Sequence, residues 1–87
     1  MKACPDLQTA LANTVEKLRK ERKLTKTALA DFADLQECYI RGITKGRRNP
    51  TVTAIYSICE ALHIPVGKFF DMVDAERKRL TDEQKMP

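Results

Sequence analysis

The sequence predicts an all-α domain, because apolar residues recur at helical spacing along most of its 87 residues and no segment alternates like a half-buried strand. Hydrophobic residues make up 43% and charged residues 32% of the chain, which is the balance of a globular protein. A chain of this length has room for one domain. We therefore expect residues 1–80 to form a single unit with its core within 7–73, followed by a flexible tail at 81–87.

The first predicted helix runs from about Asp6 to Arg22, and Asp6, which follows Pro5, is expected to cap its beginning. Steps of four, four and three residues separate its apolar members, Leu7, Leu11, Val15 and Leu18. This spacing places them on one side of the helix and leaves the charged residues on the other.

Two short helices separated by a tight turn are predicted between Thr25 and Gly46. The Thr25 hydroxyl is expected to cap the first, and Asp34 is expected to end it in the left-handed conformation. The inward side of this helix is predicted to hold Ala28, Leu29, Phe32 and Ala33. The next helix begins at Gln36, and its inward side is predicted to hold Tyr39, Ile40 and Ile43.

Two further helices follow, separated by Pro65. Thr51 or Thr53 is expected to cap the fourth helix, whose buried stripe is predicted to be Ile55, Ile58, Cys59 and Leu62. The fifth is expected to run to about Arg79, with a stripe of Val66, Phe69, Phe70 and Val73. The aromatic residues are spaced for packing and do not interleave with basic residues, which disfavours single-strand or RNA binding.

Positive charge is concentrated in one part of the chain. Residues 17–48 hold ten Lys and Arg against four Asp and Glu, whereas the remaining residues hold six against eight. A basic excess confined to the two short helices and their surroundings indicates a binding surface for a polyanion. The alternative is a charged surface that only faces solvent.

Candidate contacts to DNA lie on the outward side of the third helix and in the loop after it. A helix of about 10 Å diameter fits a major groove about 12 Å wide, where amide, carboxylate and guanidinium groups can distinguish bases. The outward side holds Gln36, Glu37, Cys38 and Arg41. The donor-rich groups suited to phosphates are Lys26, Lys45, Arg47, Arg48 and Asn49.

Gly42 lies in the middle of the third helix, where glycine costs about 1 kcal/mol relative to alanine. Close approach of the backbone to DNA is one explanation, and close packing against another helix or simple drift is the other. Cys38 is open to two interpretations, a site of oxidation or a small side chain facing a thymine methyl group.

Catalytic and metal-binding functions find little support in the sequence. Cys59 and His63 are four residues apart, but no further ligand or orienting carboxylate is evident, and Cys59 belongs to a buried stripe. The three cysteines contain no Cys-x-x-Cys pair. We expect no enzyme activity, no metal and no cofactor. No membrane span or signal pattern is visible, so we expect a cytoplasmic protein and no membrane partner.

The segments LRKERKLTKTALADFADLQECYIRGITKGRRNP and ALHIPVGKFF resemble the Cro and lambda-type repressor helix-turn-helix family, also called the XRE family. The resemblance covers about residues 14–70. It implies a compact five-helix, lambda-repressor-like domain whose second and third helices form the helix-turn-helix. It also implies that the third helix enters the major groove of double-stranded DNA and that a homodimer binds a palindromic operator.

The resemblance also assigns roles to individual residues. Base-contacting positions would be Gln36, Glu37, Cys38 and Arg41, with Gly42 beside them. Phosphate-contacting positions would be Arg19, Lys26, Lys45, Arg47, Arg48 and Asn49. Asp34 stands where the family usually has a turn glycine. Thr44 stands where the family has a Glu that pairs with the first-helix Arg, so Arg19 is expected to be free for a phosphate.

The function expected from these observations is sequence-specific transcriptional regulation by a homodimeric repressor. The fifth helix and the chain through Leu80 are the expected dimer interface, because Met72, Val73 and Leu80 exceed what so small a core needs. One alternative is the antitoxin of a toxin–antitoxin pair, which would add a toxin partner. Another, from a different class, is a helical adaptor that binds an acidic protein.

Overall fold

The computed structural model describes residues 5–85, and side chains within 6–82. The helix bounds are α1 Pro5–Glu21, α2 Lys26–Ala33, α3 Glu37–Thr44, α4 Val52–Ala61 and α5 Val66–Lys85. The described residues contain no strand, which confirms the all-α prediction. No helix in this part of the chain is long and apolar enough to cross a membrane.

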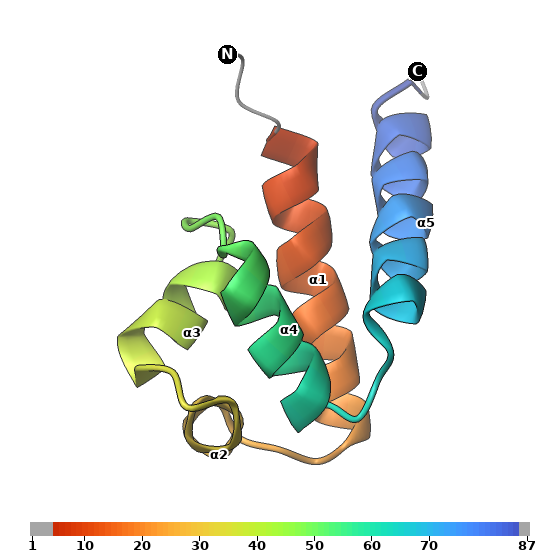
Figure 1. The fold of residues 1–87 in the computed structure, drawn as a ribbon. Helices are drawn as coiled ribbons and strands as arrows, with labels where there is room; N and C mark the ends of the chain where they lie inside the picture. Colours follow the sequence, from red (N-terminus) through yellow and green to blue (C-terminus); the bar gives the residue numbers. More distant parts are fainter. Residues whose placement is uncertain (1–4, 86–87) are drawn as a thin grey trace.

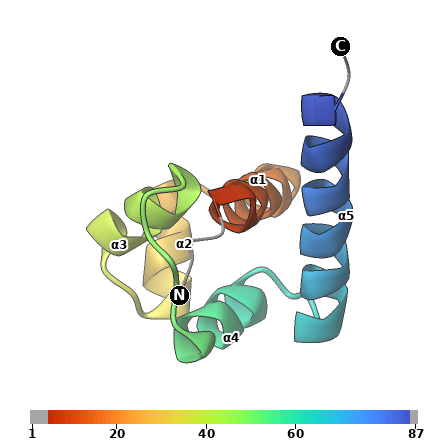
Figure 2. The same cartoon turned by 90° about the horizontal axis from the view of Figure 1, so that it is seen from above.

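The helices surround one core. In Figure 1, α1 and α5 lie side by side and run in opposite directions, and α4 lies in front of α1. Seen from above, α2 and α3 lie on one side of α1 and α5 on the other (Figure 2). The largest side chains that are almost fully buried are Phe69, Leu29, Ile40, Ile43, Ile58, Leu62, Val15 and Val73. They come from all five described helices, so each helix contributes to the same core.

Local caps and turns fix the short helices as the sequence predicts. The Thr25 hydroxyl accepts from the backbone N–H of Ala28 at 3.0 Å, and the Thr51 hydroxyl accepts from that of Ala54 at 3.1 Å. Asp34 ends α2 with φ 55°, in the left-handed region. These observations confirm the two threonine caps and the conformation expected of Asp34.

Both ends of the described chain differ from the prediction. Helix α1 already includes Pro5, so Asp6 lies within the first turn and is not the residue before the helix. Helix α5 continues to Lys85, beyond the expected end at Arg79, and thereby includes most of the segment predicted to be a flexible tail. The partly buried Leu80 packs against the core, which favours continuation of the helix past that point.

Polar contacts also hold α5 against α1. The Asn13 side-chain amide donates to Glu76 across the two helices at 2.6 Å. Arg79 donates to the same carboxylate at 2.7 and 2.8 Å. These donors lower the pKa of Glu76 to about 2, the hydrogen bond from Arg79 being the largest cause. The paired carboxylate joins the long helix to α1 near the middle of α5.

Two aromatic residues predicted to face inward are exposed instead. Phe32 is 67% exposed and Phe70 is 38% exposed. On α2 the buried positions are Leu29, Ala30 and Ala33, so the inward side is rotated away from Phe32. On α5 the buried aromatic residue is Phe69, and Phe70 meets its ring edge to face at 5.5 Å.

The conformation of Asp34 gives a stability prediction. Replacing Asp34 with Gly should stabilise the protein by about 0.5 to 1 kcal/mol, because glycine adopts a positive φ without the steric cost of a Cβ atom. Thermal unfolding should show a melting temperature raised by roughly 2 to 8 °C. The matched control is Asp31→Gly within α2, which should destabilise by about 0.3 kcal/mol, the difference between the helix propensities of Asp and Gly. A lower melting temperature for Asp34→Gly would contradict this account.

Candidate nucleic-acid interface

Helix α3 is placed by its two isoleucines. Ile40 is fully buried and Ile43 is 1% exposed, and the helix packs against both α1 and α2. This orientation leaves Gln36, Cys38 and Arg41 exposed on the opposite side. Gln36 was predicted to be the first residue of this helix, but α3 begins at Glu37 and Gln36 is its N-cap residue. The Gln36 side chain makes no capping hydrogen bond. The structure therefore brings these three predicted base-contacting residues to one accessible surface.

Glu37 is held by two partners beside that surface. The Thr27 hydroxyl donates to one carboxylate oxygen, and Arg41 Nε lies 3.5 Å from the other. The hydrogen bond from Thr27 is the main cause of a lowered pKa for Glu37, and the charge of Arg41 adds to it. Thr27 belongs to α2 and Glu37 to α3, so this contact connects the two helices of the motif. No local pattern in the sequence indicates a role for Thr27, since its partner lies on another helix.

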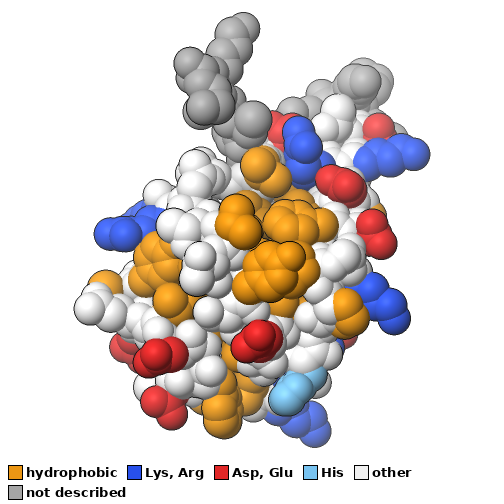
Figure 3. Space-filling view, in the orientation of Figure 1, with side chains coloured by type: hydrophobic (Ala, Val, Ile, Leu, Met, Phe, Trp, Pro, Cys, Tyr) orange, Lys and Arg blue, Asp and Glu red, His pale blue; other side chains and the backbone are white. Residues whose placement is uncertain are grey.

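The loop after α3 presents the predicted phosphate contacts. Lys45, Arg47, Arg48 and Asn49 are all exposed. Figure 3 shows Lys and Arg side chains projecting at the edge of the molecule where this loop and α3 lie. None of the hydrogen bonds or ion pairs within the described residues uses the side chain of Lys45, Arg47 or Asn49. These three groups can therefore meet a phosphate without first breaking a bond within the protein.

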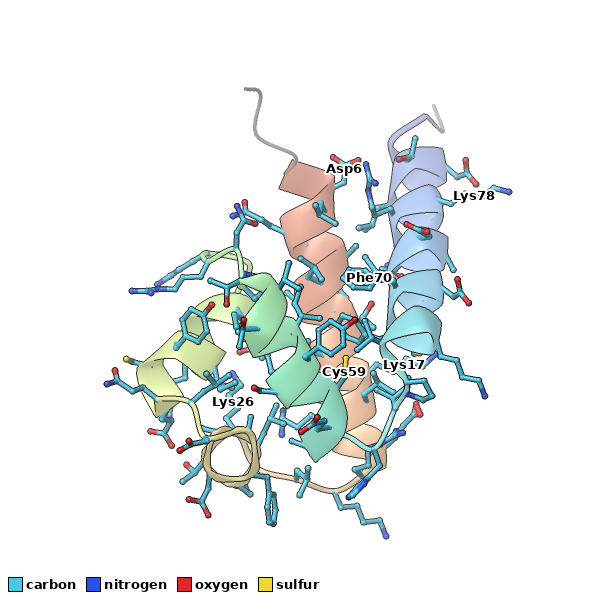
Figure 4. All side chains as sticks on the ribbon, viewed as in Figure 1. Asp6, Lys17, Lys26, Cys59, Phe70 and Lys78 are labelled. Atoms are coloured by element: carbon cyan, nitrogen blue, oxygen red, sulfur yellow. The ribbon has the colours of Figure 1, made fainter. Side chains whose placement is uncertain are left out.

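Lys26 lies apart from this loop, in the first turn of α2 (Figure 4). Its side chain is partly buried, and its charge contributes to lowering the pKa of Glu16. The first turn of α2 also presents backbone N–H groups, which favour an anion. Lys26 thus lies at the N-terminal end of α2, where a phosphate contact is expected.

Arg19 does not lie free, and that expectation is wrong. Its guanidinium donates to Glu16 at 3.0 and 2.7 Å and to the carbonyl oxygen of Leu24 at 2.6 Å. The side chain is only 14% exposed. The hydrogen bond from Arg19 is the main cause of a lowered pKa for Glu16. Thr44 cannot form the pair that a Glu at this position usually makes with the first-helix Arg. Glu16, which lies on α1 like Arg19, is the partner of Arg19 instead.

Cys59 and His63 are not arranged as a reactive pair. Cys59 is 1% exposed, and its burial raises the pKa of the thiol to about 11. His63 is exposed, with φ 53°, just after the last residues of α4. Within the described residues, no group of three or more His, Cys, Asp or Glu could hold a metal ion. Figure 4 shows Cys59 on α4, inside the helical cluster.

Comparison with known proteins identifies the family. The model of the Helix-turn-helix family matches residues 15–69. The chain belongs to this family. The match includes α2, α3 and the basic loop, and it confirms the XRE-type resemblance that the sequence indicates.

Individual relatives agree with that assignment. The chain is 38% identical over 53 residues to the immunity repressor protein of Bacillus phage phi105, a match covering 61% of this chain and 37% of the repressor. It is 29% identical over 72 residues to control protein C.MunI of Mycoplasma sp, a match covering 82% of this chain and 97% of the control protein. The restriction-modification controller protein C.Esp1396I has been solved as a tetramer in complex with its natural operator. It is 30% identical to this chain with a TM-score of 0.76, and the match covers 82% of this chain and 93% of the controller.

The environment of Arg19 predicts a structural role for this residue. Arg19→Met should destabilise the protein by about 1 to 3 kcal/mol, because it removes charged hydrogen bonds at a largely buried position. Urea unfolding measures this loss. Lys20→Met is the matched control, since Lys20 is 71% exposed and lies 3.9 Å from the same Glu16; its effect should stay within about 0.5 kcal/mol. Unchanged stability of Arg19→Met, together with weaker DNA binding, would restore the phosphate role.

Proposed function

We propose that this chain is a cytoplasmic, non-enzymatic transcriptional regulator that binds a palindromic operator in double-stranded DNA as a homodimer. The observation that carries the proposal is the placement of two groups of side chains on one surface. Gln36, Cys38 and Arg41 are exposed at the beginning and on the outer side of α3, Glu37 lies beside them, and the basic loop follows directly. An exposed helix flanked by phosphate-binding groups has the geometry of a major-groove contact.

The relatives support this function over the antitoxin and adaptor alternatives. An immunity repressor and a control protein are among them, and the C.Esp1396I controller forms a tetramer on its operator. The same site in this chain would hold operator DNA, and the phage relative supports repression as the outcome. The chain would repress transcription by occupying DNA and thereby blocking the polymerase.

The surface that we propose for dimerisation differs from the one that the sequence indicated. Val73 is 1% exposed and belongs to the core of its own chain, while Met72 and Leu80 are partly buried against that core. Large apolar side chains are exposed instead on α4 and α5: Val52 at 71%, Tyr56 at 54% and Phe70 at 38%.

Figure 3 shows hydrophobic side chains gathered over α4 and the adjoining part of α5, and in Figure 4 Phe70 projects from α5 on this side. We name Val52, Tyr56 and Phe70 the α4–α5 apolar surface. A second copy is the proposed partner, because a palindromic site requires two identical subunits related by a two-fold axis. In Figure 1, α3 lies away from the place where α4 and α5 adjoin. A second copy bound to the α4–α5 apolar surface would therefore leave the outer side of α3 uncovered.

The proposed division between base and phosphate contacts is testable with two substitutions. Duplexes selected from a random library supply the cognate site. Arg41→Ala should weaken binding to it by about 1 to 3 kcal/mol and relax one base position. Arg47→Ala should weaken cognate and random DNA alike and reduce the slope of log affinity against log salt by about one. Fluorescence anisotropy across a salt series measures both effects.

The same titrations can reject the function itself. No binding to any duplex at low salt, under conditions where an acidic protein is bound, would favour the adaptor alternative. Equal effects of both substitutions on cognate and random DNA would contradict the division of roles while leaving DNA binding intact.

The proposed interface makes a separate prediction about assembly. Tyr56→Asp should raise the dimer dissociation constant at least about tenfold, because it buries charge against its own copy across the two-fold axis. Sedimentation equilibrium without DNA measures the change. Phe32→Asp is the matched control, since Phe32 is also an exposed aromatic residue but lies on α2. Loss of dimerisation in Phe32→Asp with none in Tyr56→Asp would place the interface on α2.

A further inference from the structure

The space beside Gly42 is occupied by a side chain from the basic loop. A Cβ atom at Gly42 would lie 3.0 Å from Arg48 Cγ and 3.2 Å from Arg48 Cδ. Both are carbons of the aliphatic part of that side chain. The absence of a side chain at position 42 therefore lets Arg48 lie directly against α3.

Arg48 is held in this position from two further directions. Its guanidinium carbon lies 5.5 Å from the centroid of the Tyr39 ring, within the range of a cation–π contact. The backbone N–H groups of Arg47 and Arg48 both donate to the carbonyl oxygen of Gly42, at 2.9 and 3.2 Å. Backbone and side chain of Arg48 are thus both fixed relative to the same turn of α3.

Tyr39 is itself held in place. Its ring is partly buried against the core, and its hydroxyl accepts from the backbone N–H of Thr51 at 3.1 Å. Thr51 is the N-cap residue of α4. The aromatic ring over which Arg48 lies is therefore held mainly by its packing against the core, and the hydroxyl bond additionally joins it to the beginning of α4.

We propose that Gly42 and Tyr39 are positioning residues that hold the Arg48 guanidinium beside α3, ready for a phosphate of the same DNA segment that α3 enters. This inference rests on the proposed function and assigns a specific role to two residues that touch no phosphate. The guanidinium carbon lies over the Tyr39 ring, and no hydrogen bond or ion pair within the described residues uses the N–H donors of the Arg48 side chain. Arg48 remains exposed, so these donors are accessible.

The physical benefit is a smaller loss of side-chain freedom on binding. A free arginine has several rotatable bonds that must be fixed when it grips a phosphate. Contacts to Gly42 and Tyr39 already restrict those bonds in the unbound protein. Gly42 is thereby explained by close packing, although against the side chain of a loop residue and not against another helix as the sequence suggested.

Gly42→Ala separates stability from binding. Alanine favours the helix, and Arg48 is an exposed residue of the loop, so a methyl group can displace its side chain from α3 without disturbing the core. The melting temperature should therefore be unchanged or higher, while affinity for the cognate duplex falls about three- to tenfold. A general loss of structure would lower both together.

A double-mutant cycle distinguishes this role from direct contact between Gly42 and DNA. If Gly42 acts through Arg48, then adding Gly42→Ala to Arg48→Ala should change affinity less than about 1.5-fold. If the DNA backbone itself approaches Gly42, the methyl group will weaken binding in the Arg48→Ala protein as much as in the original protein. The second result would overturn the proposal.

Two variants of Tyr39 separate its ring from its hydroxyl group. Tyr39→Phe keeps the ring under Arg48, so cognate affinity should change less than about twofold. Tyr39→Leu removes the ring and should lower affinity about three- to tenfold, an effect that should disappear in the Arg48→Ala protein. Arg48→Lys keeps the charge but lacks the planar group, and it should bind less tightly and respond less to Tyr39→Leu.

The mobility of the Arg48 side chain gives a readout that does not depend on DNA. The heteronuclear NOE of Arg48 Nε should fall in Tyr39→Leu and Gly42→Ala and stay unchanged in Tyr39→Phe. Full DNA affinity in Gly42→Ala and Tyr39→Leu, with Arg48→Ala still weakened, would overturn the positioning role and leave the proposed function intact. No duplex binding by the original protein would instead overturn the proposed function.

Discussion

Burial of Ile40 and Ile43 is the constraint on which the proposed interface depends. Helix α3 has eight residues, and an isolated helix of that length is not stable in water. Its conformation must therefore come from packing, and these two side chains, at most 1% exposed, supply it. Because they are three positions apart, they also fix the rotation of the helix about its axis. The same burial that makes α3 helical thus determines which residues are exposed at the proposed interface.

Much of this architecture could be predicted from the sequence, because it depends on local signals. Apolar spacing located the five described helices, and the threonine caps and the turn at Asp34 fixed the boundaries around α2 and α4. Phe32 was misplaced because apolar spacing suggests a wide stripe, whereas the neighbouring helices cover only the part centred on Leu29 and Ala33. Which part is covered depends on packing that no local pattern encodes.

The candidate site was predicted in outline but not in its internal contacts. The outer residues of α3 and the loop cations follow from helix geometry and composition, whereas the partner of Arg19 depended on a choice among nearby carboxylates. Glu16, three residues earlier on α1, provides that partner. The contact between Arg48 and Tyr39 brings together residues nine positions apart in sequence, through a turn whose course after α3 could not be foreseen.

Arg41 on α3 and Arg48 in the loop after it are held with different strength. This difference suits the base contact proposed for Arg41 and the phosphate contact proposed for Arg48. Arg41 lies 3.5 Å from Glu37 in a solvent-screened pair, which is easily replaced by a bond to a base. Arg48 is restricted by Gly42, Tyr39 and its own backbone. Phosphates recur at the same places whatever the sequence, so a fixed donor costs nothing in selectivity there. The base contact that we propose for Arg41 must instead be made only at the correct site, and Glu37 provides Arg41 with an alternative partner everywhere else.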